Sequence, residues 1–212
     1  MRPVPARIVA AAIVLFARLV TAPRAIWEGI EPVPARRVYY ANHGSNGDFV
    51  LIWTVLPPAL RQVTRPVAGA DYWLRSGLRR FIGREVFNAV LIDRRPETRT
   101  EDPMALILEA VDAGASLILF PEGTRNTTDA PLLPFKSGLF NISDRRPDVD
   151  LVPVWIENLN AVMPKGKLVP IPLLCTVTFG TPVRAGSGET REAFLARAAE
   201  ALLALRPEGA TT

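Results

Sequence analysis

The chain has 212 residues, a length that a single domain normally fills. Its hydrophobic fraction of 49% is high for a soluble protein, while 22% charged residues argue against a protein with several membrane-spanning helices. The net charge is +4 and most of the positive charges are arginines, which suit phosphate binding, although an arginine-rich genome would produce the same excess. Cys175 is the only cysteine, which excludes an intrachain disulfide and a cysteine-based metal cluster and indicates a reducing compartment.

The N-terminal apolar run, residues 8–20, is shorter than the roughly 20 residues that span a bilayer. Arg18 interrupts it, and no persuasive small-residue cleavage site of a signal peptide is present. We expect residues 1–30 to form a membrane-contact segment with an interfacial helix, and residues 31–212 to form the remaining domain. A helix packed on the domain's own core is the alternative. The flanking arginines are Arg2, Arg7, Arg18 and Arg24, and the side chains available to lipid are Ile13, Leu15, Phe16, Leu19 and Trp27.

From residue 38 onward, strand-like runs alternate with helical patterns. The pattern predicts strands over residues 38–41, 66–70, 87–93, 116–120, 151–156 and 175–179, and helices over residues 48–56, 72–82, 102–114, 136–143 and 189–206. Asp102 as N-cap and Gly114 as terminator mark the third helix most clearly. Residues 94–102 and 160–172 are expected to be surface loops. The chain is therefore predicted to be α/β: a single layered domain with a central mixed sheet flanked by helices, plus the N-terminal interfacial helix.

The loop of residues 42–48, Asn-His-Gly-Ser-Asn-Gly-Asp, holds the only histidine of the chain. His43 can take a proton from a hydroxyl group, and a neighbouring carboxylate would orient its ring. Gly44 and Gly47 allow the loop to fold tightly enough for Asp48 to face His43. The pair alone is a weak motif, because Asp48 would serve equally well as the cap of the next helix and His43 as a surface residue.

A second candidate site follows the predicted strand 116–120, in the sequence Phe-Pro-Glu-Gly-Thr-Arg of residues 120–125. Open α/β sheets place their sites at the carboxyl ends of strands. Pro121 and Gly123 predict a tight turn, Glu122 can bind a hydroxyl group, and Arg125 can bind a phosphate. An ordinary turn with a salt bridge fits these residues equally well.

Other segments carry weaker signals. Arg94 also follows a predicted strand, although exposed arginines are more often solvated than bound to a ligand, and Lys136 follows Phe135 and precedes Gly138. Residues 152–154, Val-Pro-Val, have no reactive group and fit a core or edge strand with a proline. A metal site is disfavoured by the single histidine and single cysteine. Nucleic acid is disfavoured because the arginines are not interleaved with aromatic residues along one element.

In this order, His43 with Asp48, Val90 to Arg94, the turn of residues 120–125, and the segment of residues 152–154 resemble the four signature blocks of the glycerolipid acyltransferases. The resemblance is closest to the 1-acylglycerol-3-phosphate acyltransferases and covers residues 38–182. It departs at Asn88-Ala89, where members often carry glycines, and at Asn126, where they often carry serine.

The resemblance implies an enzyme that moves a fatty acyl group from acyl-CoA or acyl-carrier protein to the free hydroxyl of a lysophospholipid, most closely 1-acylglycerol-3-phosphate. It implies no cofactor, no metal and no covalent enzyme intermediate. His43 would be the general base and Asp48 its orienting carboxylate. The substrate-binding residues would be Arg94, Glu122, Gly123, Thr124, Arg125 and Lys136, and those on the acyl or thioester side would be Val152, Pro153 and Val154.

Together with the apolar N-terminus, the resemblance implies a peripheral or monotopic protein on the cytoplasmic face of the cell membrane. Its partners would be the anionic membrane surface, acyl-CoA or acyl-carrier protein, and the lysophospholipid, with no nucleic acid. One alternative is the same transfer to a different lysolipid or an aminoacyl-lipid acceptor. Another is a non-catalytic, membrane-surface lipid-binding protein of the same fold.

Overall fold

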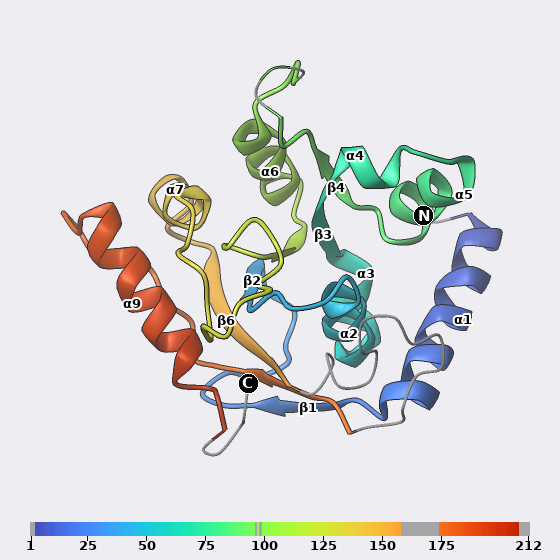
Figure 1. Cartoon of the computed structure of the whole chain (residues 1–212), viewed down its shortest axis with the longest axis horizontal. Coiled ribbons are helices and arrows are strands. Elements are labelled where there is room, and N and C mark those ends of the chain that lie inside the picture. Colours follow the sequence, from blue (N-terminus) through green and yellow to red (C-terminus); the bar gives the residue numbers. More distant parts are fainter. Residues whose placement is uncertain (1–2, 96, 98, 158–173, 208–212) are drawn as a thin grey trace.

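The computed structural model describes residues 3–95, 97, 99–157 and 174–207, and every structural statement below refers to these residues. Within them a seven-stranded sheet has the order β1-β7-β6-β2-β5-β3-β4 (Figure 1). Only the β6–β7 pair is antiparallel. The strands are β1 Arg24–Trp27, β2 Arg37–Ala41, β3 Thr64–Gly69, β4 Val90–Ile92, β5 Ser116–Leu119, β6 Asp150–Glu157 and β7 Thr176–Phe179. The predicted α/β domain with a central mixed sheet is confirmed.

Helices cover both faces of this sheet. On one face α1, α2 and α3 pack against strand residues that include Tyr39 and Ala41. On the other face α6, α7 and α9 pack against Val38 and Tyr40, because successive side chains of a strand point to opposite faces. The helices are α1 Val4–Thr21, α2 Asp48–Val55, α3 Pro58–Val63, α4 Ala70–Trp73, α5 Gly77–Phe81, α6 Pro103–Asp112, α7 Gly138–Arg145 and α9 Arg191–Leu203, with a π-helix, η1, over Ile82–Val86.

The adjacent parallel strands β2 and β5 are followed by helices on opposite faces of the sheet. The chain leaves β2 through α2 on one face, whereas it leaves β5 for α7 on the other. β3 lies beyond β5, and β6 lies beyond β2. This is a topological switch point, the place where open α/β sheets bind their ligands. The loops that follow Ala41 and Leu119 are therefore both at the expected site.

The two best-marked helices form as predicted. Asp102 caps α6 by accepting a hydrogen bond from the Met104 backbone N–H at 3.0 Å, and Gly114 follows the helix with a φ of +85°. The last helix, α9, buries Phe194, Ala198 and Leu202.

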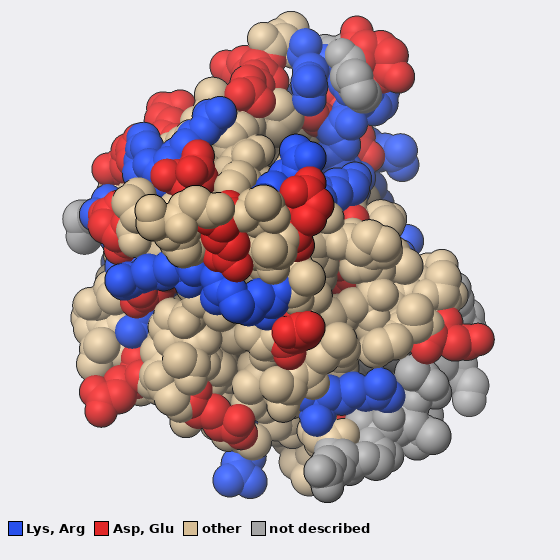
Figure 2. Space-filling model, turned by 90° about the vertical axis from the view of Figure 1, so that its left-hand side faces the viewer, with Lys and Arg blue, Asp and Glu red and all other residues tan. Residues whose placement is uncertain are grey.

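The surface on the α9 side carries positive and negative side chains interspersed, as Figure 2 shows. Arg197 pairs with Glu189, and Arg184 pairs with Asp150. This face has the mixed charge of an ordinary water-exposed surface.

The segment between β3 and β4 differs from the prediction. The single helix expected over residues 72–82 is wrong, because the chain forms α4 and then restarts at α5, where the Ser76 hydroxyl accepts from the Arg79 backbone N–H. The π-helix η1 continues to Val86, so the strand expected over residues 87–93 is reduced to β4. Asn88 lies between them with a φ of +52°, a conformation that asparagine tolerates.

Two short elements were not predicted, and one prediction is outside the structure. Pro57-Pro58 ends α2 as expected, but Pro58 also begins α3, since proline fits the first turn of a helix. Arg24–Trp27 forms the edge strand β1, so the sheet includes residues ahead of the boundary expected at residue 30. The loop expected over residues 160–172 lies outside the described residues.

The N-terminal helix α1 packs on η1 and α2 through small residues and turns large ones outward. Its buried side chains include Ala6, Ala10, Val14 and Ala17. Five large apolar side chains are each at least 60% exposed: Val4, Ile8, Leu15, Phe16 and Leu19. The helix therefore packs on the core, as the alternative expected, and its apolar outer face leaves the expected membrane contact a prediction.

By length and composition alone, α1 is long and apolar enough to cross a membrane, with 18 residues and a mean hydropathy of 1.9. Buried core helices and N-terminal signal sequences also meet these criteria. Trp27, which was expected to face lipid with this helix, lies instead in β1, where its ring stacks on Phe179 with a centroid separation of 4.0 Å.

Candidate active site

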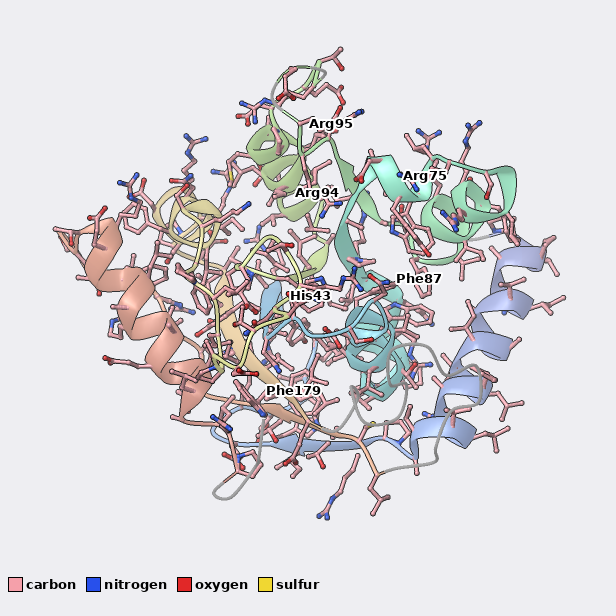
Figure 3. All side chains as sticks on the ribbon, viewed as in Figure 1. His43, Arg75, Phe87, Arg94, Arg95 and Phe179 are labelled. Atoms are coloured by element: carbon pink, nitrogen blue, oxygen red, sulfur yellow. The ribbon has the colours of Figure 1, made fainter. Side chains whose placement is uncertain are left out.

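The loop after β2 brings the histidine and the aspartate together. His43 Nδ1 lies 2.9 Å from Asp48 Oδ2. The side chain of Asp48 is 3% exposed and that of His43 is 18% exposed, so only the histidine is open to a substrate. An ionised carboxylate can only accept, so Nδ1 carries the proton and Nε2 presents a free lone pair. Figure 3 shows His43 near the middle of the sheet, with Arg94 and Arg95 beyond the end of β4.

Asp48 shapes the loop rather than the helix that it begins. Its Oδ2 also accepts from the backbone N–H groups of Gly44 and Ser45, at 2.9 and 2.8 Å. Gly47 occupies the N-cap of α2, and no side chain caps that end. The interpretation of Asp48 as a helix cap is therefore wrong. One carboxylate oxygen fixes both the loop backbone and the imidazole.

Glu122 connects the loop after β2 to the turn after β5. It is 2% exposed, its Oε1 accepts from the backbone N–H of His43 at 2.9 Å, and its Oε2 accepts from that of Leu133 at 2.8 Å. We expected Glu122 to bind a substrate hydroxyl. In the structure both of its oxygens accept hydrogen bonds from backbone N–H groups, so Glu122 positions the backbone of His43.

Burial raises the pKa of Glu122 above its ordinary value of 4.5, and the hydrogen bonds from Leu133 and His43 lower it in part. A buried carboxylate costs stability unless donors surround it, and here two backbone donors do. Burial therefore disfavours the charged form of Glu122.

Three further residues hold His43 and were not found from the sequence. The ring of Phe120 stacks on the imidazole with a centroid separation of 4.0 Å and an interplanar angle of 17°. The backbone N–H of Asn126 donates to the His43 carbonyl at 2.6 Å. Asn42 exchanges two hydrogen bonds with the backbone of Ile156 in β6, at 3.0 and 2.8 Å. Asn42 and Phe120 belong to the two motifs and Asn126 follows the second, and this placement was the only sign of their role in the sequence.

The turn after β5 carries exposed positive charges next to the residues that contact His43. Gly123 has a φ of +70°, and a Cβ there would lie 2.7 Å from Lys136 Cε, so the turn requires glycine and lets the lysine side chain cross it. Thr124, Arg125 and Lys136 are exposed. Within the described residues, the charged groups of Arg125 and Lys136 have no acidic partner, which leaves them available to an anion.

Arg94 follows β4, as expected, but it is already paired. Its Nη2 lies 3.1 and 3.2 Å from the two carboxylate oxygens of Asp71, which follows β3. A Cβ on Gly69 would approach both side chains within 3 Å, so this glycine makes room for the pair. The arginine is half exposed. An incoming phosphate would compete with Asp71.

Val152, Pro153 and Val154 are buried in β6. They pair with Tyr39, Tyr40 and Ala41 of β2, just before the catalytic loop. On the other side of Pro153, the chain of β7 leaves the regular ladder, and the Gly180 N–H donates to the Pro153 carbonyl. Their assignment to the acyl or thioester side stays a prediction.

Among the described residues, no group of three or more His, Cys, Asp or Glu side chains is arranged to hold a metal ion. The roles assigned to individual residues from the sequence stay predictions, but the geometry gathers the loop after β2 and the turn after β5 into one place.

Known proteins resemble this chain in sequence. The model of the family described as "Acyltransferase" matches residues 24–157, more than half of the chain. A 1-acyl-sn-glycerol-3-phosphate acyltransferase of Cocos nucifera is 29% identical over 169 residues, which cover 76% of this chain and 50% of the relative. The enzyme of that name from Haemophilus influenzae is 29% identical over 114 residues, covering 50% and 42%. The chain thus spans about half the length of these curated relatives.

A solved structure supports the fold. The crystal structure of the 1-acyl-sn-glycerophosphate acyltransferase of Thermotoga maritima aligns with a TM-score of 0.63 at 23% identity. The alignment covers 96% of this chain and 83% of the other. The two chains share the layered fold described above.

Proposed function

This chain belongs to the acyltransferase family, and we propose that it transfers a fatty acyl group from a thioester donor to the free hydroxyl of a lysophospholipid. The observation that carries the proposal is the 2.9 Å contact between His43 and Asp48 at the switch point of the sheet. The names of the curated relatives favour 1-acylglycerol-3-phosphate as the acceptor, which would give phosphatidate.

In the proposed reaction, Nε2 of His43 takes the proton of the acceptor hydroxyl while its oxygen attacks the thioester carbonyl carbon. The new C–O ester bond forms, the C–S bond breaks, and the imidazolium returns its proton to the leaving thiolate. Asp48 stabilises the imidazolium and keeps the ring oriented. The substrate hydroxyl is itself the nucleophile, so no covalent enzyme intermediate is needed.

The exposed cations favour an acceptor that carries a phosphate. Arg125 and Lys136 lie on and across the turn that also holds Glu122, the residue that contacts the His43 backbone. Arginine binds phosphate oxygens through paired donors. We assign Arg125, Lys136 and, after release from Asp71, Arg94 to the acceptor phosphate.

We further propose that the protein works at a membrane surface, on the cytoplasmic face of the cell membrane. The outward apolar side chains of α1 support contact with lipid, where a lysophospholipid resides. Acyl-CoA and acyl-carrier protein are both proposed as donors, because each presents the same thioester.

The test is a thiol-release assay with both donors and a panel of lysophospholipids, using the purified wild-type protein and His43→Ala. We expect turnover to be highest with 1-acylglycerol-3-phosphate and to be lost in the variant. Preference for another lysolipid would replace the acceptor but keep the reaction. Lipid binding without any turnover in the wild-type protein would instead support a non-catalytic lipid-binding protein of the same fold.

A further inference from the structure

A groove lies between α1 and the α2–α3 pair. Its volume is about 650 Å³, within the range of ligand pockets. The helix α1 provides one wall through Ala10, Val14 and Leu15, and the other wall is formed by Trp53 and Pro58. None of the residues of the proposed active site lines it. The groove is therefore a separate, mostly apolar site.

Three arginines line the same groove, and no acidic residue is among its described lining residues. Arg7 and Arg18 project from α1, are exposed, and have no acidic partner in the part of the chain that the structure describes. They are eleven residues apart, so they lie on the same side of the helix, about 16 Å from each other along its axis.

Arg61 is held rigidly at the opposite wall. Its guanidinium donates to the backbone carbonyl oxygens of Trp53, Thr54 and Leu56, at 2.7 to 2.9 Å, and so closes the C-terminal end of α2. Burial lowers the pKa of Arg61, and the nearby charge of Arg18 lowers it further. Arg18 and Arg61 both line the groove and repel each other, and an anion bound there would relieve that repulsion.

The groove continues into the outward apolar face of α1. Leu15 contributes both to the groove lining and to the exposed apolar stripe that includes Ile8 and Leu19. On a helix lying at a membrane interface, the apolar stripe enters the acyl region and arginines at its margin remain at the level of the lipid phosphates. Arg7 and Arg18 have that marginal position.

We propose that the groove between α1 and α3 holds an anionic phospholipid of the membrane, with its phosphate between Arg18 and Arg61 and part of an acyl chain against Val14 and Leu15. The net positive charge of the lining selects an anionic lipid over a zwitterionic one. The site docks the protein on the bilayer and lies apart from the catalytic residues. It does not depend on the acyl transfer proposed above.

The experiment measures binding of dihexanoyl phosphatidylglycerol, as dispersed monomers, to the full-length protein by isothermal titration calorimetry at about 0.15 M salt. Dihexanoyl phosphatidylcholine is the zwitterionic comparison. The test variant is Arg18→Gln, an exposed position that is safe for folding. The matched control is Arg145→Gln, which removes the same charge from α7 on the other face of the sheet, where Arg145 is exposed and has no acidic partner within the described residues. His43→Ala tests whether the lipid occupies the reaction site instead.

We expect saturable binding of one phosphatidylglycerol per chain and at least tenfold weaker binding of phosphatidylcholine. Arg18→Gln should weaken phosphatidylglycerol binding about tenfold, the loss of one charge-assisted hydrogen bond, whereas Arg145→Gln and His43→Ala should leave it unchanged. Equal binding of the two lipids, or equal effects of Arg18→Gln and Arg145→Gln, would overturn the proposal. Loss of binding in His43→Ala would also overturn it, because the lipid would then lie in the active site.

Discussion

The catalytic loop and the cationic rim around it are built in opposite ways. Asp48 and Glu122 are almost fully buried, and their oxygens accept hydrogen bonds from the loop that carries His43. Arg94, Arg125 and Lys136 are exposed, and only Arg94 has an acidic partner among the described residues. The group that moves protons is thus fixed before substrate arrives, while the groups expected to bind phosphate remain adjustable.

This difference has an energetic reason. A general base must lie within hydrogen-bonding distance of the reacting hydroxyl, and errors of about 1 Å are costly. A phosphate, by contrast, is attracted by charge over several ångströms and accepts donors from many directions. The comparison predicts large losses of activity from changes in the buried set and smaller, binding-specific losses from changes in the rim.

Asp48→Asn should give the largest effect. The amide would replace the carboxylate that orients the imidazole and stabilises its charged form, so we expect kcat to fall by about 10² to 10⁴-fold with little change in KM. Steady-state thiol release measures both constants, and circular dichroism checks the fold. A variant that keeps more than a tenth of the wild-type kcat would show that the buried aspartate is only structural.

Glu122→Ala should lower both stability and activity. It leaves the part-buried N–H groups of His43 and Leu133 without their acceptor, at a cost of up to about 1 to 3 kcal/mol for each group. The activity should fall through kcat, since the loop that carries His43 loses its anchor. Urea unfolding and thiol release measure the two effects. Unchanged kcat in a folded Glu122→Ala protein would remove this residue from the positioning of the base.

The stability difference between wild type and Glu122→Ala should also depend on pH. Burial raises the pKa of Glu122 in the folded protein, so folding favours the neutral acid. Its contribution is fully present below pH 4.5 and is lost as the pH rises through the raised pKa of the folded state. We therefore expect the gap between the two unfolding free energies to narrow as the pH increases. A gap that widens over this range would contradict the raised pKa.

The sequence alone predicted the parts of the site that are local in the chain. The strands ending at Ala41 and Leu119 have clear apolar patterns, and the residues after them fall at the same edge of the sheet because parallel strands align their carboxyl ends. The short loop with two glycines also predicted the contact between His43 and Asp48. These inferences need only periodicity and turn chemistry.

The parts that were missed depend on contacts distant in sequence. Glu122 reaches the His43 backbone across 79 residues, and no spacing rule indicates which backbone group a buried carboxylate will accept from. Helix propensity joins residues 72–82, whereas Ser76 caps a new helix within this range, and η1, which packs against α1, begins at Ile82. The strand β1 has only four residues and acquires its conformation by pairing with β7, more than a hundred residues later.

On the rim, Arg125→Ala should raise KM for a phosphate-bearing acceptor by about ten- to a hundredfold, which corresponds to the loss of one charge-assisted contact, with kcat nearly unchanged. Arg145→Ala on α7 is the matched control, because it removes the same charge away from the site. Kinetics with an acceptor series measure the effect. A fall in kcat without a change in KM would place Arg125 with the buried catalytic set and would break the comparison.

The smallest effect is expected for Asp71→Asn, and the direction of the change in KM is what distinguishes the two possible roles of Arg94. Asp71 holds Arg94 at 3.1 and 3.2 Å, and both side chains are substantially exposed, so the pair adds at most about 1 kcal/mol to stability. Removing the carboxylate would free the guanidinium and remove a negative charge that repels the acceptor phosphate. We therefore expect KM to fall by about two- to fivefold while the unfolding free energy changes by less than about 1 kcal/mol. Arg94→Gln should raise KM instead. If Asp71→Asn raises KM as Arg94→Gln does, the acceptor requires the intact ion pair, and Arg94 belongs to the preorganised part of the site rather than to its adjustable rim.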